Sequence, residues 1–164
     1  MQKITCSFIG HRAQNLPFGF NEDDPRCLEL KKKLQSIIEN LYETGVRHFI
    51  TGMATGVDMY AAEIVIELKK EHPDIILESA IPYETQAIYW SVAMRERYYN
   101  IAAKCDIETM LQHRYTADCI RKRNIFMVNH SDYVVAVLDG RRNIISNTVE
   151  YAKTVGKGVI CIES

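Results

Sequence analysis

The chain has 164 residues, of which 47% are hydrophobic and 25% are charged, and its formal net charge is -1. A chain of this length can bury about two thirds of its unfolded surface, so we expect one domain spanning residues 1–164. A charge this close to zero argues against a broad electrostatic surface for duplex DNA or for an anionic membrane.

Cysteine, histidine and hydropathy patterns narrow the class of protein further. Five cysteines without a CxxC pair indicate reduced thiols rather than a disulfide framework or a zinc knuckle, which favours a cytoplasmic location. The five histidines show no HExxH or paired-ligand spacing, so we expect no bound metal. No apolar run approaches the roughly 20 residues that span a bilayer, and we therefore expect no membrane partner.

The chain begins with a predicted strand that ends in a candidate anion contact. Residues 4–9 are mostly apolar, and Gly10, His11 and Arg12 follow them directly. A guanidinium can hold phosphate oxygens through paired N–H donors. The alternative is that Arg12 makes only a surface ion pair. Residues 13–24, with several Asn, Asp, Gly and Pro, predict a loop that can act as a flap over this site.

A second predicted strand leads into a turn with two glycines. A helical repeat over residues 25–44 precedes this strand, which covers residues 48–51. Gly52 and Gly56 lie in the turn, and a helix opens at Val57. Glycine permits positive φ and close approach, and N–H groups at a helix start favour a negative ligand, so the turn predicts a phosphate contact. The alternative is a tight strand–helix connection that binds nothing.

The second half of the chain continues the alternation of strands and helices. The predicted elements are a strand over residues 75–81, a long helix over 84–104, a short strand over 106–111, a helix over 118–130, a strand over 133–138, a helix over 146–155 and a strand over 158–162. Tyr89 and Trp90 lie in the long predicted helix, where aromatic residues are more often core or subunit interface than base-stacking platforms. On this basis we expect a homodimer.

This order of elements predicts an α/β fold with a mostly parallel sheet and helices on both faces. In such sheets ligands lie outside the carboxyl ends of the strands, at the switch point. Three strand ends carry glycine together with polar side chains, namely Gly10-His11-Arg12, Thr51-Gly52 and Asp139-Gly140. Their recurrence predicts one cleft at that edge of the sheet.

Three segments resemble a known family. They are Gly10-His11-Arg12, Thr51-Gly52-Met53-Ala54-x-Gly56-Val57-Asp58-Met59-x-Ala61-Ala62-Glu63, and Arg123-Asn124-x-x-Met127-Val128-x-His130-Ser131-Asp132-x-x-Val135-Ala136-Val137-x-Asp139-Gly140. From Gly10 almost to its end the chain resembles the YpsA-like branch of the SLOG superfamily. These are Rossmann-like relatives of the DNA-processing protein DprA and of the LOG enzymes, which hydrolyse cytokinin riboside monophosphates. The resemblance implies a Rossmann-like three-layer sandwich that binds a nucleotide or a nucleotide-derived ligand, with no other cofactor.

One segment departs from the family pattern. Family members usually carry Gly-Gly-Thr after the Asp-Gly, whereas Asn143, Ile144 and Ile145 stand roughly at these positions here. Branched side chains would keep a phosphate away from the backbone N–H groups. Either the ligand has changed, or Arg141 and Arg142 hold the phosphate, or binding has been lost.

The favoured hypothesis is a regulatory domain that binds or senses a nucleotide ligand. Its phosphate contacts would be Arg12, the amides of the glycine turn and the start of the last helix, while Asp58 would order its loop or contact a sugar hydroxyl. The predicted ligand-binding residues are Gly10, His11, Arg12, Thr51, Gly52, Gly56, Asp58, Arg123, Asn124, Asp139, Gly140, Ser146 and Asn147.

Two other functions stay open. The first is an N-glycosidic hydrolase akin to the LOG enzymes, in which Arg123 and Glu150 would flank the ribose. The second is single-stranded DNA binding similar to that of DprA, or a protein-interaction module, and nucleic acid is thus an alternative partner but not the favoured one. Its basic patch would consist of Arg114, Arg121, Lys122, Arg123, Arg141 and Arg142.

Overall fold

The computed structural model describes residues 3–163, and a sheet of six strands runs through this part of the chain. The strands are β1 (Ile4–Ile9), β2 (Val46–Thr51), β3 (Ile76–Ile81), β4 (Ile107–Met110), β5 (Tyr133–Leu138) and β6 (Gly158–Glu163). Their order across the sheet is β4-β3-β2-β1-β5-β6, and every neighbouring pair is parallel. The predicted α/β class is confirmed, and the sheet is wholly parallel.

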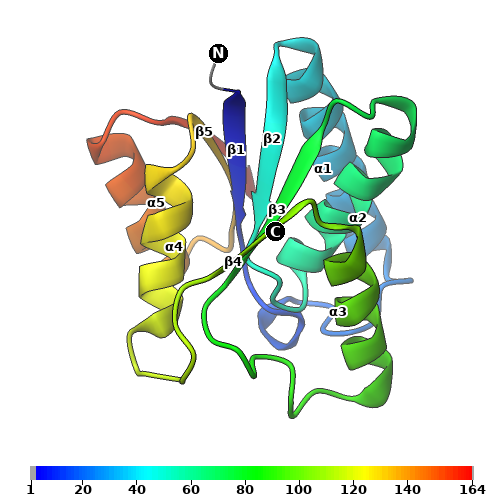
Figure 1. Ribbon diagram of the computed structural model, residues 1–164, viewed down its shortest axis with the longest axis vertical. Helices are drawn as coiled ribbons and strands as arrows, with labels where there is room; N and C mark the ends of the chain where they lie inside the picture. The colour runs from blue at the N-terminus through cyan, green and yellow to red at the C-terminus, as the bar shows by residue number, and fades with distance from the viewer. Residues whose placement is uncertain (1–2, 164) are drawn as a thin grey trace.

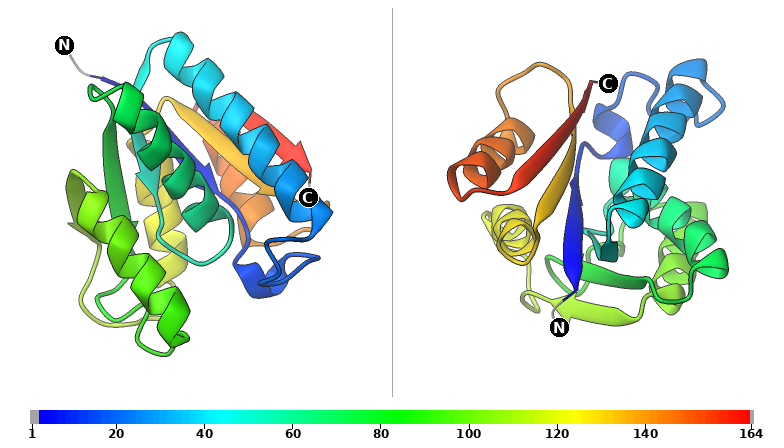
Figure 2. Two further views of the ribbon diagram at one scale, coloured as in Figure 1. Left: turned by 90° about the vertical axis from the view of Figure 1, so that its right-hand side faces the viewer. Right: turned by 90° about the horizontal axis from the view of Figure 1, so that it is seen from above.

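Helices cover both faces of the sheet (Figure 1, Figure 2). They are α1 (Pro25–Glu43), α2 (Val57–Glu71), α3 (Val92–Lys104), α4 (Cys119–Asn129) and α5 (Ile144–Thr154), and a short 3₁₀ turn, η1 (Ala13–Asn15), follows β1. The first three α-helices pack on one face and the last two on the other, which gives the three layers of a Rossmann-like sandwich. Within residues 3–163, no helix combines the length and the apolar character needed to cross a membrane.

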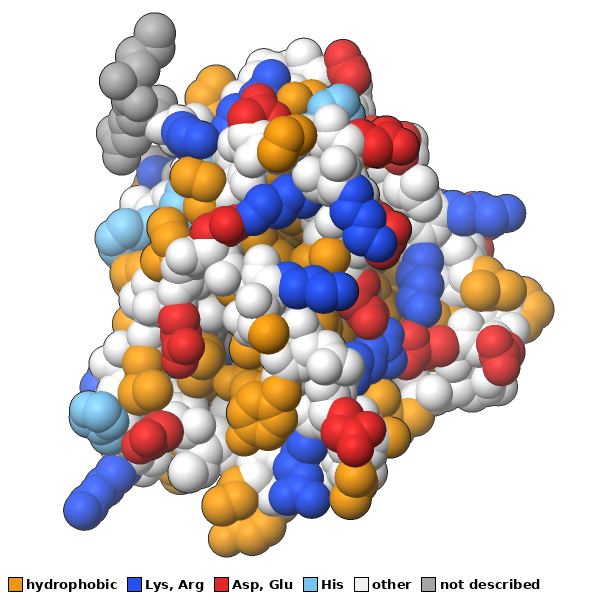
Figure 3. All heavy atoms as spheres, turned by 45° about the vertical axis from the view of Figure 1, so that its right-hand side comes forward, with side chains coloured by type: hydrophobic (Ala, Val, Ile, Leu, Met, Phe, Trp, Pro, Cys, Tyr) orange, Lys and Arg blue, Asp and Glu red, His pale blue; other side chains and the backbone are white. Residues whose placement is uncertain are grey.

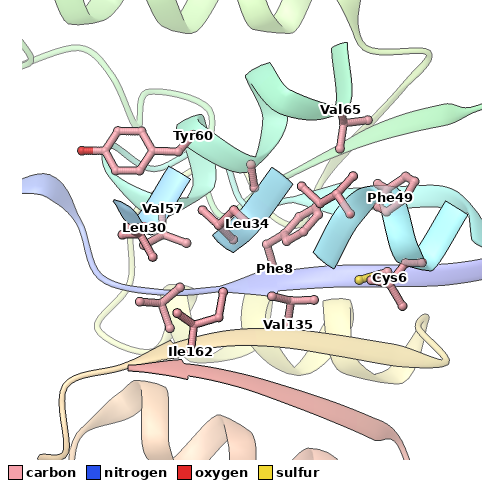
Figure 4. Packing of buried hydrophobic residues seen from close by; sticks show 14 of the residues in the cluster. Cys6, Phe8, Leu30, Leu34, Phe49, Val57, Tyr60, Val65, Val135 and Ile162 are labelled. Atoms are coloured by element: carbon pink, nitrogen blue, oxygen red, sulfur yellow. The ribbon is translucent and has the colours of Figure 1, made fainter. Parts of the chain in front are cut away.

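The main core lies between the sheet and the layer of α1 and α2. Phe8 of β1 and Phe49 of β2 stack with their ring centroids 5.9 Å apart. Leu30 and Leu34 of α1 and Val65 of α2 belong to the same buried cluster (Figure 4). Full burial of one large apolar side chain stabilises the fold by about 1.5–3 kcal/mol. The many buried side chains of this cluster together hold the ends of the strands in fixed positions.

The long helix predicted over residues 84–104 is wrong in its first part, because α3 begins only at Val92. Residues 82–91 form successive turns, and the Ser91 side chain caps α3 by accepting a hydrogen bond from the Met94 N–H (3.3 Å). The buried side chain of Gln86 donates to the carbonyls of Gly52 and Met53 and so ties this segment to the glycine turn. Tertiary hydrogen bonding thus overrides helix propensity here.

The switch point of the sheet lies beside β1. The chain runs from β1 through β2 and β3 to β4 on one side, and β5 and β6 lie on the other, so the carboxyl ends of β1 and β5 border a crevice. In Figure 1 the loop that follows β1 lies below the sheet.

Candidate functional site

Thr51 and Asp58 organise the turn between β2 and α2. The Thr51 hydroxyl donates to the Asp58 backbone carbonyl (3.0 Å) and accepts from the Met53 N–H (3.3 Å). The Asp58 carboxylate accepts from the Ala54 N–H (3.2 Å). Met53 has a φ of 62°, an uncommon conformation for a non-glycine residue. Asp58 therefore orders its loop, which is one of the two roles predicted for it.

Arg123 reaches from α4 to the same turn. Its Nη1 donates to the Gly52 carbonyl (2.6 Å), its Nε donates to Asn124 Oδ1 (3.0 Å), and the residue is only 5% exposed. A Cβ at Gly52 would lie 2.6 Å from Arg123 Nη1 and 2.8 Å from Asp58 Oδ2. The close approach that glycine permits at this position is made by a guanidinium of the same chain.

Gly56 and Gly10 bring the end of β1 against the start of α2. Gly56 has a φ of 83°, and a Cβ there would lie 2.5 Å from the His11 carbonyl oxygen. A Cβ at Gly10 would lie 2.5 Å from the Val57 Cβ. The Val57 N–H donates to the His11 carbonyl (3.3 Å). Both glycines therefore have a packing role within the chain.

A polar cluster joins β1 to β5 across the switch point. His11 Nε2 lies 3.1 Å from Asp139 Oδ2, and Asn143 Nδ2 donates to Asp139 Oδ1 (3.2 Å). The Arg141 backbone N–H also donates to this carboxylate and is the largest cause that holds the pKa of Asp139 below its usual value. Gly140 follows with a φ of 80° and open space around it. Two of the three predicted strand ends thus meet.

The N-terminus of α5 is capped by side chains of its N-cap residue and first turn. Asn143 Oδ1 accepts from the N–H groups of Ile145 (3.0 Å) and Ser146 (3.1 Å), and the Ser146 hydroxyl accepts from the Asn143 N–H (2.9 Å). This capping box satisfies N–H groups that a phosphate would need. Asn147 is exposed. Neither Ser146 nor Asn147 lines the cavities described next, and α5 begins two residues before the predicted start.

The strand-end pocket is a cavity of about 280 Å³ at the switch point. Ile144 and Ile145 give it an apolar wall, in place of the glycines expected there. Predicted site residues from three separate segments line it, and these are Gly10, His11, Arg12, Asp58, Arg123 and Asn124.

The aromatic cleft is a cavity of about 690 Å³ that shares Arg12, Ala54 and Ile120 with the strand-end pocket. Its aromatic lining consists of Phe20 from the predicted flap and Tyr83, Tyr89 and Trp90 from residues 82–91. Its other lining residues are Gln14, Thr55, Gln86, Ser91 and Met94.

The sequence prediction missed the aromatic cleft. Tyr89 and Trp90 were predicted to lie in the core or at a subunit interface. Phe20 and Tyr83 were not predicted to line a site. The available signal was the position of residues 82–91 directly after a strand end, where loops carry binding residues. Self-association, for which Tyr89 and Trp90 were the basis, stays a prediction.

Arg12 lies where the two cavities meet. It is an exposed residue, and within residues 3–163 its guanidinium has no hydrogen-bond or ion-pair partner. Arg12 therefore does not make the surface ion pair that was the alternative interpretation. An unpaired guanidinium beside an apolar cavity can bind an anion.

Asp58 and Arg123 are two buried charged side chains that both line the strand-end pocket. Burial raises the pKa of the Asp58 carboxyl to about 6, although the charge of Arg123 acts in the opposite direction. Burial likewise lowers the pKa of the Arg123 guanidinium, against the charge of Asp58. A carboxyl with a strongly shifted pKa in a cavity is a common feature of functional sites.

The predicted hydrolase pair is not brought together. Glu150 is exposed on α5, with its Oε1 3.8 Å from Arg142 Nη2, whereas Arg123 is buried at the strand ends. Arg141 and Arg142 are exposed outside both cavities. Across residues 3–163, no group of three or more His, Cys, Asp or Glu side chains is placed to hold a metal ion.

Solved structures with the same fold include two DNA-processing proteins. DNA processing protein A (DprA) from Streptococcus pneumoniae matches 99% of this chain with a TM-score of 0.66 and 16% identity. The chain spans about half of that protein, namely 51%. DprA from Helicobacter pylori, described for its single-stranded DNA binding mode, matches 97% of this chain with a TM-score of 0.64 and 16% identity, over 65% of its own length. At this identity the likeness shows the fold.

This chain matches a larger share of its sequence relatives than of these two solved structures. The SPbeta prophage-derived protein YoqJ of Bacillus subtilis is 34% identical over 143 residues, which are 79% of this chain and 84% of that protein. A UPF0398 protein of Halalkalibacterium halodurans is 30% identical over 141 residues, or 85% of this chain and 73% of that protein. The model of the YpsA family, described as the YspA SLOG family, matches residues 6–156. The chain therefore belongs to the YspA SLOG family.

Proposed function

We propose that this protein binds a nucleotide or a nucleotide-derived ligand, with the base in the aromatic cleft and the phosphate at Arg12. The observation that carries the proposal is an unpaired guanidinium in the lining of a cavity that also has four aromatic side chains. Aromatic side chains stack on a nucleobase with about 1–3 kcal/mol per base, and arginine holds phosphate through two parallel hydrogen bonds. The volume of about 690 Å³ lies within the usual range for small-molecule sites.

The strand-end pocket would receive a polar part of the same ligand. Asp58, Asn124 and His11 offer hydrogen-bonding groups there, and a carboxylate is a common partner of sugar hydroxyls. The pocket is the smaller of the two cavities, and two isoleucines narrow its wall. We assign the base to the aromatic cleft and the ribose to the junction of the two cavities, because the ribose joins the base to the phosphate at Arg12.

A binding or sensing role is favoured over hydrolysis. The Arg123 guanidinium already donates to Gly52 and Asn124, so little of it is left for a substrate. Glu150 lines neither cavity.

A thermal-shift experiment tests the proposal. AMP at about 100 times its Kd should stabilise the wild type by about 2.7 kcal/mol, which raises Tm by about 5–10 °C. Adenosine and ribose 5-phosphate each lack one half of the recognised group, so they should give smaller shifts. Arg12→Gln should reduce the AMP shift to that of adenosine. An AMP shift that survives in Arg12→Gln would contradict the assignment of the phosphate.

Single-stranded DNA is the second candidate ligand. It is supported by the likeness in fold to the Helicobacter pylori DprA, whose description names that ligand, and by aromatic side chains beside Arg12. A labelled oligonucleotide should then bind with an affinity that falls steeply as salt rises. Binding that AMP displaces would place both ligands in the aromatic cleft, whereas an unchanged anisotropy in low salt would eliminate this candidate.

A further inference from the structure

The flap, residues 13–24, carries one wall of the aromatic cleft. Leu16 and Phe18 are 5% and 8% exposed, and both belong to the main core. Phe20 is 53% exposed and lines the cleft instead. Glu22 follows two residues later and is held by an ion pair. Phe20 therefore lies between an apolar anchor and a charged anchor.

Arg97 of α3 makes the charged anchor. Its Nη2 donates to Glu22 Oε1 (2.8 Å), and its Nε donates to Glu63 Oε2 of α2 (3.1 Å). Lys31 of α1 donates to the same Glu22 carboxylate (2.7 Å), and its Nζ lies 4.8 Å from the centroid of the Tyr60 ring. These contacts tie the flap to three helices of one layer.

The pair of Glu22 and Arg97 is partly shielded from water, with both side chains 22% exposed. Burial raises the pKa of Glu22, but hydrogen bonds from Arg97 and Lys31 outweigh burial and lower the pKa to about 2. The carboxylate therefore stays charged at neutral pH. A guanidinium that grips two carboxylates fixes their geometry more firmly than an ammonium does. Figure 3 shows blue and red side chains alternating over the face on which α3 lies, with hydrophobic side chains below them.

We propose that Glu22 and Arg97 form a latch that holds Phe20 in the wall of the aromatic cleft, so that Arg97 is a positioning residue for a ligand it does not touch. The proposal rests on the proposed function for the nature of that ligand. If the wall of the cleft is already ordered in the free protein, binding does not have to supply the entropic cost of ordering it. The affinity for the ligand is then higher.

Limited digestion with chymotrypsin tests the latch without any ligand. Arg97→Gln and Glu22→Gln should each be cut after Phe20 several times faster than the wild type, since the local opening of this segment becomes easier. The matched control is Arg47→Gln, which removes an ion pair between β2 and Asp74 (2.9 Å) away from both cavities. The double variant should be cut no faster than Glu22→Gln alone, because Glu22→Gln already removes the pair with Arg97 together with the ion pair to Lys31. Cleavage after Phe20 at the wild-type rate in Arg97→Gln overturns the latch.

Calorimetric titration with AMP tests the positioning role. Arg97→Gln should bind AMP about fivefold more weakly, Arg97→Lys should recover part of the loss, and Arg47→Gln should bind as the wild type does. Faster cleavage with unchanged AMP affinity in Arg97→Gln overturns the positioning role. A wild type that does not bind AMP overturns the proposed function and the positioning role together, and the digestion result still decides whether the latch exists.

Discussion

Asp58 is a carboxylate that the fold removes from water. It is 4% exposed, and its partners are the Ala54 N–H and the charge of Arg123. Its pKa of about 6 lies above the value near 3.9 of an unfolded aspartate. The folded state therefore holds the Asp58 proton more tightly than the unfolded state does between these two pH values.

This difference predicts how stability depends on pH. The contribution of Asp58 to the free energy of unfolding is fully present below about pH 4 and is lost as pH rises through about 6. Relative to Asp58→Asn, the wild type should lose about 3 kcal/mol over this range, since one pKa unit corresponds to 1.36 kcal/mol. Urea unfolding of both proteins from about pH 4 to pH 7 measures the difference. A difference that is constant with pH would contradict the raised pKa.

Gly52 is a second residue whose role follows from a single contact. Its φ is not positive, so the cost of Gly52→Ala comes from the overlap of the new Cβ with Arg123 and Asp58. We expect a loss of about 1–3 kcal/mol in the free energy of unfolding. Gly140→Ala is the comparison, because open space surrounds Gly140 and only its φ of 80° opposes a side chain. Equal losses in the two variants would argue against a tight Gly52–Arg123 contact.

At the scale of elements, the start of α5 replaces a glycine loop by a self-contained cap. Asn143 and Ser146 satisfy each other's backbone N–H groups, and Asn143 also binds Asp139. Under the proposed function the phosphate would be held by Arg12 and not by the start of α5.

The cap itself is open to measurement. Asn143→Ala should lower the free energy of unfolding by about 1 kcal/mol, because two N–H groups lose their acceptor. Asn143→Ser keeps an N-cap acceptor and should lose clearly less. Thermal melting of both variants gives the result, and equal melting temperatures for wild type and Asn143→Ala would show that the cap contributes nothing.

For the molecule as a whole, the sequence predicts the layers better than the site. The apolar run at residues 133–138 and the repeat at residues 25–44 depend on local periodicity, and both became the expected elements. Residues 84–91 did not form the predicted helix. The Gln86 side chain donates instead to the carbonyls of Gly52 and Met53, which are distant in sequence. The strand-end residues Gly10, His11 and Asp58 could be grouped in advance from topology. Phe20 and Tyr83 could not, since only the fold brings the flap opposite residues 82–91.

The same limit applies to charge. From sequence alone, Arg12 and Arg123 are equivalent candidates for an anion. The structure separates them, because Arg123 is buried and donates to Gly52 and Asn124, whereas the Arg12 guanidinium has no hydrogen-bond or ion-pair partner in the described part of the chain. Partners of a charged side chain depend on contacts that no local pattern encodes.

The chain has one tryptophan, Trp90, and it lines the aromatic cleft. Its intrinsic fluorescence therefore reports directly on a base that stacks there. Titration with AMP should change this fluorescence in a saturable manner, with at least about tenfold weaker binding in Arg12→Gln, and ribose 5-phosphate should leave it unchanged. If AMP leaves Trp90 fluorescence unaltered at millimolar concentration, the aromatic cleft is not a nucleotide site.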